Sequence, residues 1–457
     1  MKRVTTLLLL VLFAGPEMAR GQTGVAARLL LDVVAAARHE STVALPAGAR
    51  LNPGGIDMRQ LVELALTGNA DLLATRQRTL EAQGLLRQAG FRPNPGVEAS
   101  VSSGSMLGSA GEHEVSLGYA HTFELGGKLA RRLDVAQRVA DVAELEVADR
   151  QRELIADVKS RYVDALTALR NLETVSRLLE LSEQGFRLIQ ARVAQGEAPR
   201  LEQGLLRVEV ARLASDRVLF ESQADRAALE LKTLAGLNPD EPLSLTREWD
   251  MAPITISADE VIQRALTARP DLLAARREEE LRQAELRLAR AEAAPDVIGF
   301  ARYIRTRSQF DQFGLSAAGT RMPIRDRDNL LSVGVSIALP VRNRNQGNIQ
   351  AATARVNAAR LRREYLEQIV RRQARAAHGR YEAARRALEI LDRDGVSQAR
   401  ENVDVIRASY DLGETRLLDL VNEQRRLVDT ERTYAELARE YYLAQVELER
   451  AVGAPLR

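Results

Sequence analysis

The chain contains no cysteine among its 457 residues, and aromatic residues make up only 4% of it. Without cysteine there are no disulfides, no thiolate metal ligands and no thiol that could carry a lipid anchor. So few aromatics, combined with abundant Ala, Leu, Arg and Glu, are typical of long helices and coiled coils rather than of a compact enzyme. The formal net charge is only +2, so the composition indicates no general attraction to nucleic acid.

Long apolar runs are also absent after the N-terminus, which excludes transmembrane helices of about 18 or more residues. The one strongly apolar stretch, Val4–Gly15, follows Lys2 and Arg3 and precedes the small-residue site Ala19-Arg20-Gly21. This order of a charged, an apolar and a small-residue segment predicts a secretory signal peptide at residues 1–21. An exported chain without membrane helices is periplasmic, secreted or an outer-membrane barrel.

Catalytic and metal-binding patterns are missing as well. No Ser/His/Asp or paired-carboxylate arrangement stands out, and the four histidines are not spaced as metal ligands. They are His39, His113, His121 and His378. We therefore expect neither an enzyme nor a bound cofactor or metal.

What the sequence does contain is a duplication. Ala65-Leu66-Thr67, followed by Asp71-Leu72-Leu73-Ala74, returns 200 positions later as Ala265-Leu266-Thr267, followed by Asp271-Leu272-Leu273-Ala274. Such a repeat in register predicts two structurally equivalent halves. We expect a poorly ordered leader at 22–55, a first repeat at 56–256 and a second at 257–457.

Each half contains alternating segments that predict β-strands, near 97–103 and 114–123 in the first and near 297–305 and 330–339 in the second. In the second strand of each half, apolar residues alternate with small or polar ones; His121 is the exception. This pattern is typical of a strand with one face on lipid and the other on a wet lumen, although strands of soluble sandwiches also alternate. The expected lipid-facing residues are Val115, Leu117, Tyr119, Phe123, Leu331, Val333, Val335, Ile337 and Leu339.

Long helical stretches follow the strands, at 128–194 and 200–235 in the first half and at 345–412 and 416–452 in the second. A helix of about 67 residues is roughly 100 Å long, several times the diameter of a globular domain. Along the last helix, large residues recur every seven positions, which predicts knobs-into-holes packing against neighbouring helices. These residues are Leu420, Leu427, Tyr434, Tyr441 and Leu448.

Four strands cannot close a membrane barrel, because even small bacterial barrels have about eight, and unpaired strand edges are costly in lipid. Three copies would supply twelve strands and twelve long helices. The sequence thus predicts a mainly α fold with a small β membrane part, in which duplicated helical hairpins form a trimeric α-barrel continuous with a 12-stranded β-barrel.

Three further segments make the chain resemble a known family. They are Phe123-Glu124-Leu125-Gly126-Gly127-Lys128, Leu339-Pro340-Val341-x-Asn343-Arg344-Asn345-Gln346-Gly347, and Tyr410-x-x-Gly413-x-x-x-x-Leu418-Asp419-Leu420. With the doubled Ala-Leu and Asp-Leu-Leu-Ala motif, these segments resemble the TolC-like outer-membrane efflux proteins, over residues 56–453. The first two are most similar to the heavy-metal cation (CzcC-type) branch of that family.

The resemblance implies a homotrimeric channel-tunnel in the outer membrane of a Gram-negative bacterium, with its helical part in the periplasm. It would contact outer-membrane lipid, a periplasmic membrane-fusion adaptor and an inner-membrane pump of the proton-driven RND type. The expected substrate is heavy-metal cations; drug efflux and type I protein secretion are the alternatives. A periplasmic coiled-coil adaptor without a pore is the rival from another class.

Within this family, an iris of coiled-coil helices closes the periplasmic end of the tunnel, and a carboxylate just after the second helical turn forms a charged ring there. Asp419 matches that position, and Asn422 stands where the best-known member has a second carboxylate. Glu202 lies six positions after Gly196, as Asp419 lies six positions after Gly413, so Glu202 could contribute a further carboxylate to the same end of the helices. Alternatively, Asp419 is a solvated residue favoured by the helix dipole. The residues expected to form the turns and dock the adaptor are Gly196, Glu197, Gly413, Glu414 and Tyr410.

Overall fold

The structure is a computed structural model that describes residues 55–104, 112–246, 253–412 and 414–456. All the helices and strands discussed below belong to one compact unit, Ile56–Arg457. The expected signal peptide at 1–21 and nearly all of the expected leader at 22–55 lie outside the described residues.

Within this unit the same order of elements occurs twice. The first half consists of α2 (Met58–Gly68), α3 (Ala70–Ala89), β1 (Gly96–Ser103), β2 (Glu112–Phe123), α4 (Lys128–Ala194) and α5 (Arg200–Ala235). The second consists of α6 (Ala258–Ala268), α7 (Pro270–Ala291), β3 (Val297–Leu315), β4 (Arg321–Ile337), α8 (Gln346–Asp411) and α9 (Leu417–Val452).

The repeated sequence motif forms the break between the first two helices of each half. Asn69 caps α3 by accepting a hydrogen bond from the N–H of Leu72 at 3.0 Å. In the second half Pro270 begins α7, where its missing N–H costs nothing, and Asp271 pairs with Arg269 at 2.6 Å. Leu72 and Leu272 are both fully buried, so the motif packs the core.

Each half also buries one tyrosine of its longest helix. Tyr162 of α4 donates a hydrogen bond to the carbonyl oxygen of Thr246 at 3.0 Å. Tyr381 of α8 donates one to the carbonyl oxygen of Ile254 at 3.1 Å. Their side chains lie in two separate hydrophobic clusters, one in each half. The long helices are thereby fixed to the segments that join the two halves.

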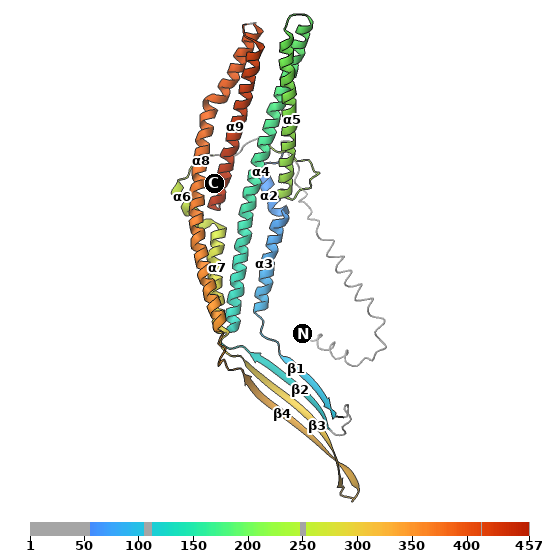
Figure 1. Cartoon of the computed structure of the whole chain (residues 1–457). Coiled ribbons are helices and arrows are strands. Elements are labelled where there is room, and N and C mark those ends of the chain that lie inside the picture. Colours follow the sequence, from blue (N-terminus) through green and yellow to red (C-terminus); the bar gives the residue numbers. More distant parts are fainter. Residues whose placement is uncertain (1–54, 105–111, 247–252, 413, 457) are drawn as a thin grey trace. The chain divides into compact units, whose positions relative to one another are not determined.

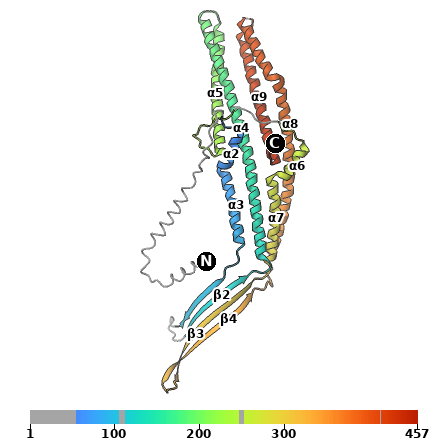
Figure 2. The ribbon, with the colours of Figure 1, turned by 180° about the vertical axis from the view of Figure 1, so that it is seen from behind.

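The helices form layers that lead away from the sheet. Next to the sheet they lie in the order α3, α4, α7, α8, and farther away in the order α5, α4, α9, α8 (Figures 1 and 2). The sheet is therefore at one end of the helices, and the α4–α5 and α8–α9 turns are at the other. On α9 the five residues of the seven-residue repeat are all buried or half-buried, as its packing pattern predicts.

The four strands form one antiparallel sheet in the order β1-β2-β3-β4. β3 and β4 are longer than the sequence indicated: 297–305 and 330–339 were expected, whereas the strands are Val297–Leu315 and Arg321–Ile337. The additional residues show no regular alternation of apolar with polar side chains, and in Arg325-Asp326-Arg327-Asp328 basic residues alternate with acidic ones. Hydrophobic alternation therefore missed a hairpin that extends beyond β2, whose first residue, Glu112, pairs with Ser308.

Candidate functional site

The turn between α4 and α5 is formed around a glycine in a left-handed conformation. Gly196 has a φ of 79°. Its N–H donates to the carbonyl of Val193 at 3.1 Å, and the N–H of Glu197 donates to that of Arg192 at 2.8 Å. These two bonds satisfy carbonyl groups that the helix end would otherwise leave unpaired. A residue with a Cβ would be strained here, so the turn depends on glycine.

The turn between α8 and α9 has the corresponding bond. The N–H of Glu414 donates to the carbonyl of Ser409 at 2.9 Å. Gly413, the residue expected to form this turn, lies outside the described residues. Apolar side chains next to the two turns are exposed to solvent, and these are Leu201 (72%), Leu412 (76%) and Leu418 (47%).

The three expected gate residues lie close to these turns, on two different helices. Asp419 is exposed in the first turn of α9, where its carboxylate accepts a hydrogen bond from the N–H of Arg416 at 3.2 Å. Asn422 is exposed one turn later, and Glu202 is half-buried in the first turn of α5. Among the described residues, no hydrogen bond or ion pair joins Glu202 to Asp419. Within one copy, Asp419 therefore acts as a helix cap.

A small apolar cluster fixes the two hairpin ends against each other. It contains Ile189 of α4, Leu206 of α5, and Leu417 and Val421 of α9, all buried. Tyr410 of α8 is half-buried against this cluster, so within one copy it is a packing residue. The cluster positions the first turns of α5 and α9, which carry Glu202 and Asp419.

A buried ion pair that the sequence analysis missed joins the hairpins nearby. Glu209 of α5 is only 5% exposed. Arg425 of α9 donates to it at 2.5 and 3.0 Å, and Arg212 donates to its other oxygen at 2.9 Å. Burial opposes ionisation of this carboxyl group, but the hydrogen bonds and charges of both guanidinium groups outweigh burial and lower its pKa.

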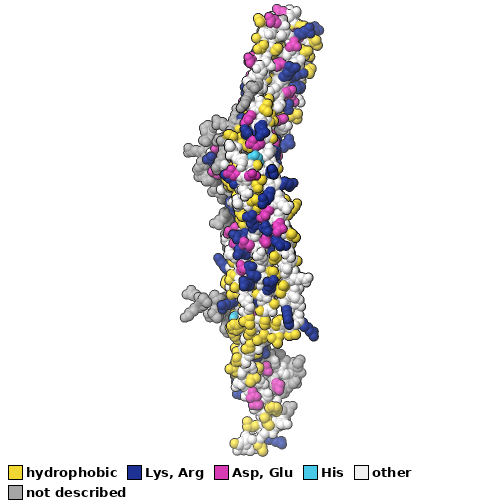
Figure 3. Space-filling view, turned by 90° about the vertical axis from the view of Figure 1, so that its left-hand side faces the viewer, with side chains coloured by type: hydrophobic (Ala, Val, Ile, Leu, Met, Phe, Trp, Pro, Cys, Tyr) yellow, Lys and Arg dark blue, Asp and Glu magenta, His cyan; other side chains and the backbone are white. Residues whose placement is uncertain are grey.

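At the other end of the unit, the sheet has two chemically different faces. One carries the expected lipid-facing side chains within β2 and β4, together with Val97 and Val101 of β1. Figure 3 shows hydrophobic side chains gathered where the sheet joins the helices, whereas charges cover the helices. The exposed fractions are 50% for Val115, 55% for Leu117, 51% for Tyr119, 54% for Phe123, 69% for Leu331, 76% for Val333, 65% for Val335 and 48% for Ile337. Leu339, which was expected in the strand, follows its end at Ile337, because the chain turns at Pro340.

The opposite face is polar on β1 and β2, and on β3 and β4 it mixes polar residues with Ile298, Phe300, Ile304 and Leu330. Ser100 and Ser116 form a hydrogen bond of 2.7 Å across β1 and β2. Arg302 of β3 reaches Glu98 of β1 at 2.9 Å across the intervening strand. This reach is possible because Gly118, which pairs with both residues, has no side chain between them. A sheet with one apolar and one polar face can separate lipid from water.

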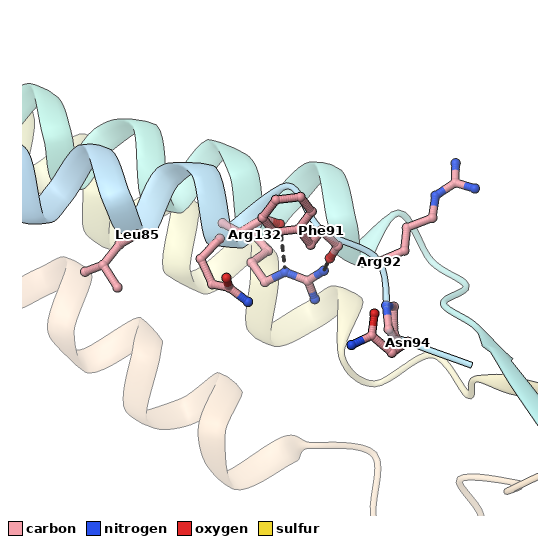
Figure 4. Close-up of a pocket in the computed structure, with 8 residues that line it drawn as sticks. Leu85, Phe91, Arg92, Asn94 and Arg132 are labelled. Atoms are coloured by element: carbon pink, nitrogen blue, oxygen red, sulfur yellow. Dashed lines mark hydrogen bonds between the residues drawn. The ribbon is translucent and has the colours of Figure 1, made fainter. Parts of the chain in front are cut away.

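An open cavity of about 690 Å³ lies where α3 leads into β1. Arg132 of α4 holds its wall in place by donating to the carbonyl oxygens of Ala89 at 3.1 Å and Phe91 at 3.0 Å (Figure 4). The same guanidinium pairs with Glu124 at 2.7 Å, so one side chain connects three segments. Leu85 and Phe91 line the cavity and are more than half exposed.

None of the helices in the described residues has an apolar stretch long enough to cross a membrane. In the described part of the chain, no three or more His, Asp or Glu side chains are arranged to hold a metal ion.

The profile of a protein family matches most of the chain. The family is described as outer membrane efflux protein, and the match covers residues 61–237 and 261–454, one segment in each half.

Individual relatives match over most of their own length. The cobalt-zinc-cadmium resistance protein CzcC of Cupriavidus metallidurans is 22% identical, over 94% of this chain and 98% of that protein. The pyoverdine export outer membrane protein OpmQ of Pseudomonas aeruginosa is 27% identical, over 87% of this chain and 80% of that protein. A crystal structure of CusC, from a study of its folding and transmembrane channel formation, has a TM-score of 0.70 at 18% identity and covers 91% of this chain and 96% of that one.

Proposed function

Because the chain belongs to the outer membrane efflux protein family, whose members are transport conduits and not enzymes, we propose that three copies form one channel through the outer membrane. Each copy contributes four strands to a twelve-stranded barrel and its long helices to a periplasmic tunnel. The channel is the outermost component of a tripartite pump, with a periplasmic adaptor and an inner-membrane transporter of the proton-driven RND type.

The observation that carries this proposal is the open sheet. Among the described strands, β1 pairs with β2 alone and β4 with β3 alone, so both edges are unpaired, yet one face is strongly apolar. Each unpaired backbone group in lipid costs several kcal/mol, roughly. Pairing β4 of one copy with β1 of the next removes every edge once the ring closes.

The edges of the helical layer support the same arrangement. On one edge Leu80 and Leu85 of α3, and Phe91 just after it, are exposed by 58%, 54% and 59%. On the opposite edge Leu361 and Tyr365 of α8 are exposed by 59% and 66%. Two different apolar edges on one chain fit a head-to-tail ring, in which α3 of one copy packs on α8 of the next.

The helical turns are the proposed docking surface for the adaptor. The exposed leucines beside them, Leu201, Leu412 and Leu418, supply apolar contact area with Glu197 and Glu414 at its rim. Asp419, with Glu202 and Asn422 nearby, is the proposed gate, since three copies bring three carboxylates around one axis. A ring of carboxylates attracts cations and repels anions.

Heavy-metal cations are the proposed substrate, supported by the similarity to the cobalt-zinc-cadmium resistance protein. The second candidate is an organic substrate such as a drug or a siderophore, which the pyoverdine export relative favours at slightly higher identity. Type I protein secretion is a further alternative, on which the relatives named above have no bearing.

Two measurements test the proposal. The full chain, purified in mild detergent, is expected to have three times the mass of one chain by native mass spectrometry and to conduct ions in a planar bilayer. A stable, non-conducting monomer would contradict the channel. Deleting the gene should lower the cobalt, zinc and cadmium concentrations that stop growth; increased sensitivity to drugs alone would favour the second candidate.

A further inference from the structure

On the apolar face of the sheet, the hydrophobic band ends in a group of arginines at the side away from the helices. Arg305 and Arg307 follow Tyr303 on β3, while Arg325 and Arg327 precede Leu331 on β4. The strand register places them on the same face as Tyr303 and Leu331, because Tyr303 pairs with Leu331 and Arg307 pairs with Arg327. We call these four residues the arginine group.

Acidic residues at the same height lie on the opposite face. The sequence Arg325-Asp326-Arg327-Asp328 alternates, so the two arginines face one side and the two aspartates the other. Glu112 and Glu114 of β2 pair with Ser308 and Thr306, which places them with the aspartates on the polar face. Charge is thus sorted by face: basic on the apolar side, acidic on the polar side.

The arginine group lacks an internal counter-charge. All four side chains are exposed, and among the described residues none of the four forms an ion pair. Arg307 and Arg327 stand directly opposite each other, and like charges in that arrangement destabilise a sheet. An anion outside the chain would relieve this repulsion.

Among the described residues, the strand of a neighbouring copy that adjoins this face offers no such anion. In the proposed ring, β1 of the next copy adjoins β4, and its one acidic residue, Glu98, lies on the polar face with Arg302. The connection that follows β1, residues 104–111, contains no Asp or Glu. In the proposed ring, the remaining neighbour of this face is the membrane.

We propose that the arginine group binds the phosphate groups of phosphorylated glycolipid (lipid A) in the outer leaflet of the outer membrane. This inference rests on the proposed function, which places the apolar face in lipid and the β3–β4 turn outside the cell. Arg327 lies four residues beyond Leu331, roughly 13 Å along the strand, where headgroups begin. Guanidinium groups bind phosphate through paired hydrogen bonds, and charges near the interface cost little.

The test uses the purified full chain in neutral detergent and three probes: lipid A with two phosphates, its fully dephosphorylated form, and inorganic phosphate. Bound lipid is counted by native mass spectrometry. Each basic side chain near an anionic surface strengthens binding about fivefold, so R305Q/R307Q/R325Q/R327Q should bind lipid A at least tenfold more weakly. The matched control, E112Q/E114Q/D326N/D328N, changes the same number of charges at the same height on the other face and should bind normally.

Three results would overturn the proposal. They are equal binding of dephosphorylated lipid A by the wild-type chain, displacement of lipid A by millimolar inorganic phosphate, and normal binding by the quadruple Gln variant. The first two need only the wild-type chain, so the proposal is tested even if that variant does not fold. Conductance is measured on the same samples: lipid A binding without a pore would contradict the channel, whereas a pore without phosphate-dependent binding would contradict the lipid site.

Discussion

Arg425 on α9 donates two hydrogen bonds, of 2.5 and 3.0 Å, to one buried oxygen of Glu209 on α5. The two residues belong to different halves of the chain, so this contact joins the first helical hairpin to the second. It lies beyond the apolar cluster of Leu206, Leu417 and Val421, on the side away from the turns. Any movement that separates the hairpin ends must break it.

We expect Glu209→Gln to loosen the α5–α9 contact, because it leaves Arg425 and Arg212 without their counter-charge. Breaking a fully buried pair costs about 3–5 kcal/mol, but the Arg425 side chain is 44% exposed, so the expected loss is about 1–2 kcal/mol. Hydrogen exchange should become faster in α5 and α9 near these residues and stay unchanged in the sheet. Glu221→Gln, at an exposed position of the same helix, is the control; equal effects of both variants would contradict a specific role for Glu209.

The same pair predicts a pH dependence. The pKa of Glu209 is lowered from its ordinary value of 4.5 in the folded chain, so its ionised form stabilises the fold. That stabilisation is complete above the unfolded pKa and is lost as the pH falls through the lower, folded pKa. The difference in exchange rate between wild type and Glu209→Gln should therefore be constant at neutral pH and shrink below about 4.5. A difference that persists unchanged at lower pH would show that the carboxylate charge is not responsible.

The sequence predicts helices and strands wherever buried and exposed positions alternate regularly along the chain, because the residue types then repeat with the same spacing. The seven-residue repeat of α9 arises because the helix packs against neighbouring helices. The alternation at Val333 and Val335 arises because successive side chains of the strand point to opposite faces of the sheet. Beyond Leu331 that contrast ends, although the backbone continues as a strand, so the β3–β4 extension was missed. The Glu209–Arg425 pair was missed for another reason: its partners are 216 residues apart, and neither helix alone shows that they meet.

A glycine contact offers a stability prediction. Gly236, with a φ of 70°, ends α5 so close to the α2–α3 break that a Cβ would lie 2.3 Å from the carbonyl oxygen of Gly68. Gly236→Ala must push the backbone at the end of α5 away from that at Gly68, and it places a side chain on a residue in the left-handed conformation. We therefore expect the free energy of unfolding, measured with denaturant, to fall by about 2–4 kcal/mol. Gly185→Ala is the control. Gly185 lies within α4, where an added Cβ would meet no atom within 4 Å, so the substitution should stabilise the folded chain by about 0.5–1 kcal/mol. Similar behaviour of the two variants would contradict the close contact.

The two faces of the sheet should tolerate charge differently. Val333 is 76% exposed on the apolar face, and Ser332 precedes it on the polar one. In lipid, Val333→Lys is expected to cost about 2–4 kcal/mol, which should reduce the heat-resistant oligomer in outer-membrane fractions. Ser332→Lys should assemble like wild type. If both variants assemble equally, Val333 does not face lipid.

The final prediction separates the proposed gate from simple helix capping at Asp419. Asp419→Ala removes both the charge and the hydrogen bond to the Arg416 N–H, whereas Asp419→Asn removes the charge but keeps an oxygen that can accept this bond. If three carboxylates surround the axis, the wild-type channel should prefer cations in planar bilayers and be blocked by multivalent cations from the periplasmic side. Both variants should weaken selectivity and block to the same extent, and Asn422→Asp should strengthen the block if that residue also faces the axis. If Asp419 is only a cap, the Ala variant should lose about 0.5–2 kcal/mol of stability, the Asn variant should resemble wild type, and neither should change the ion currents.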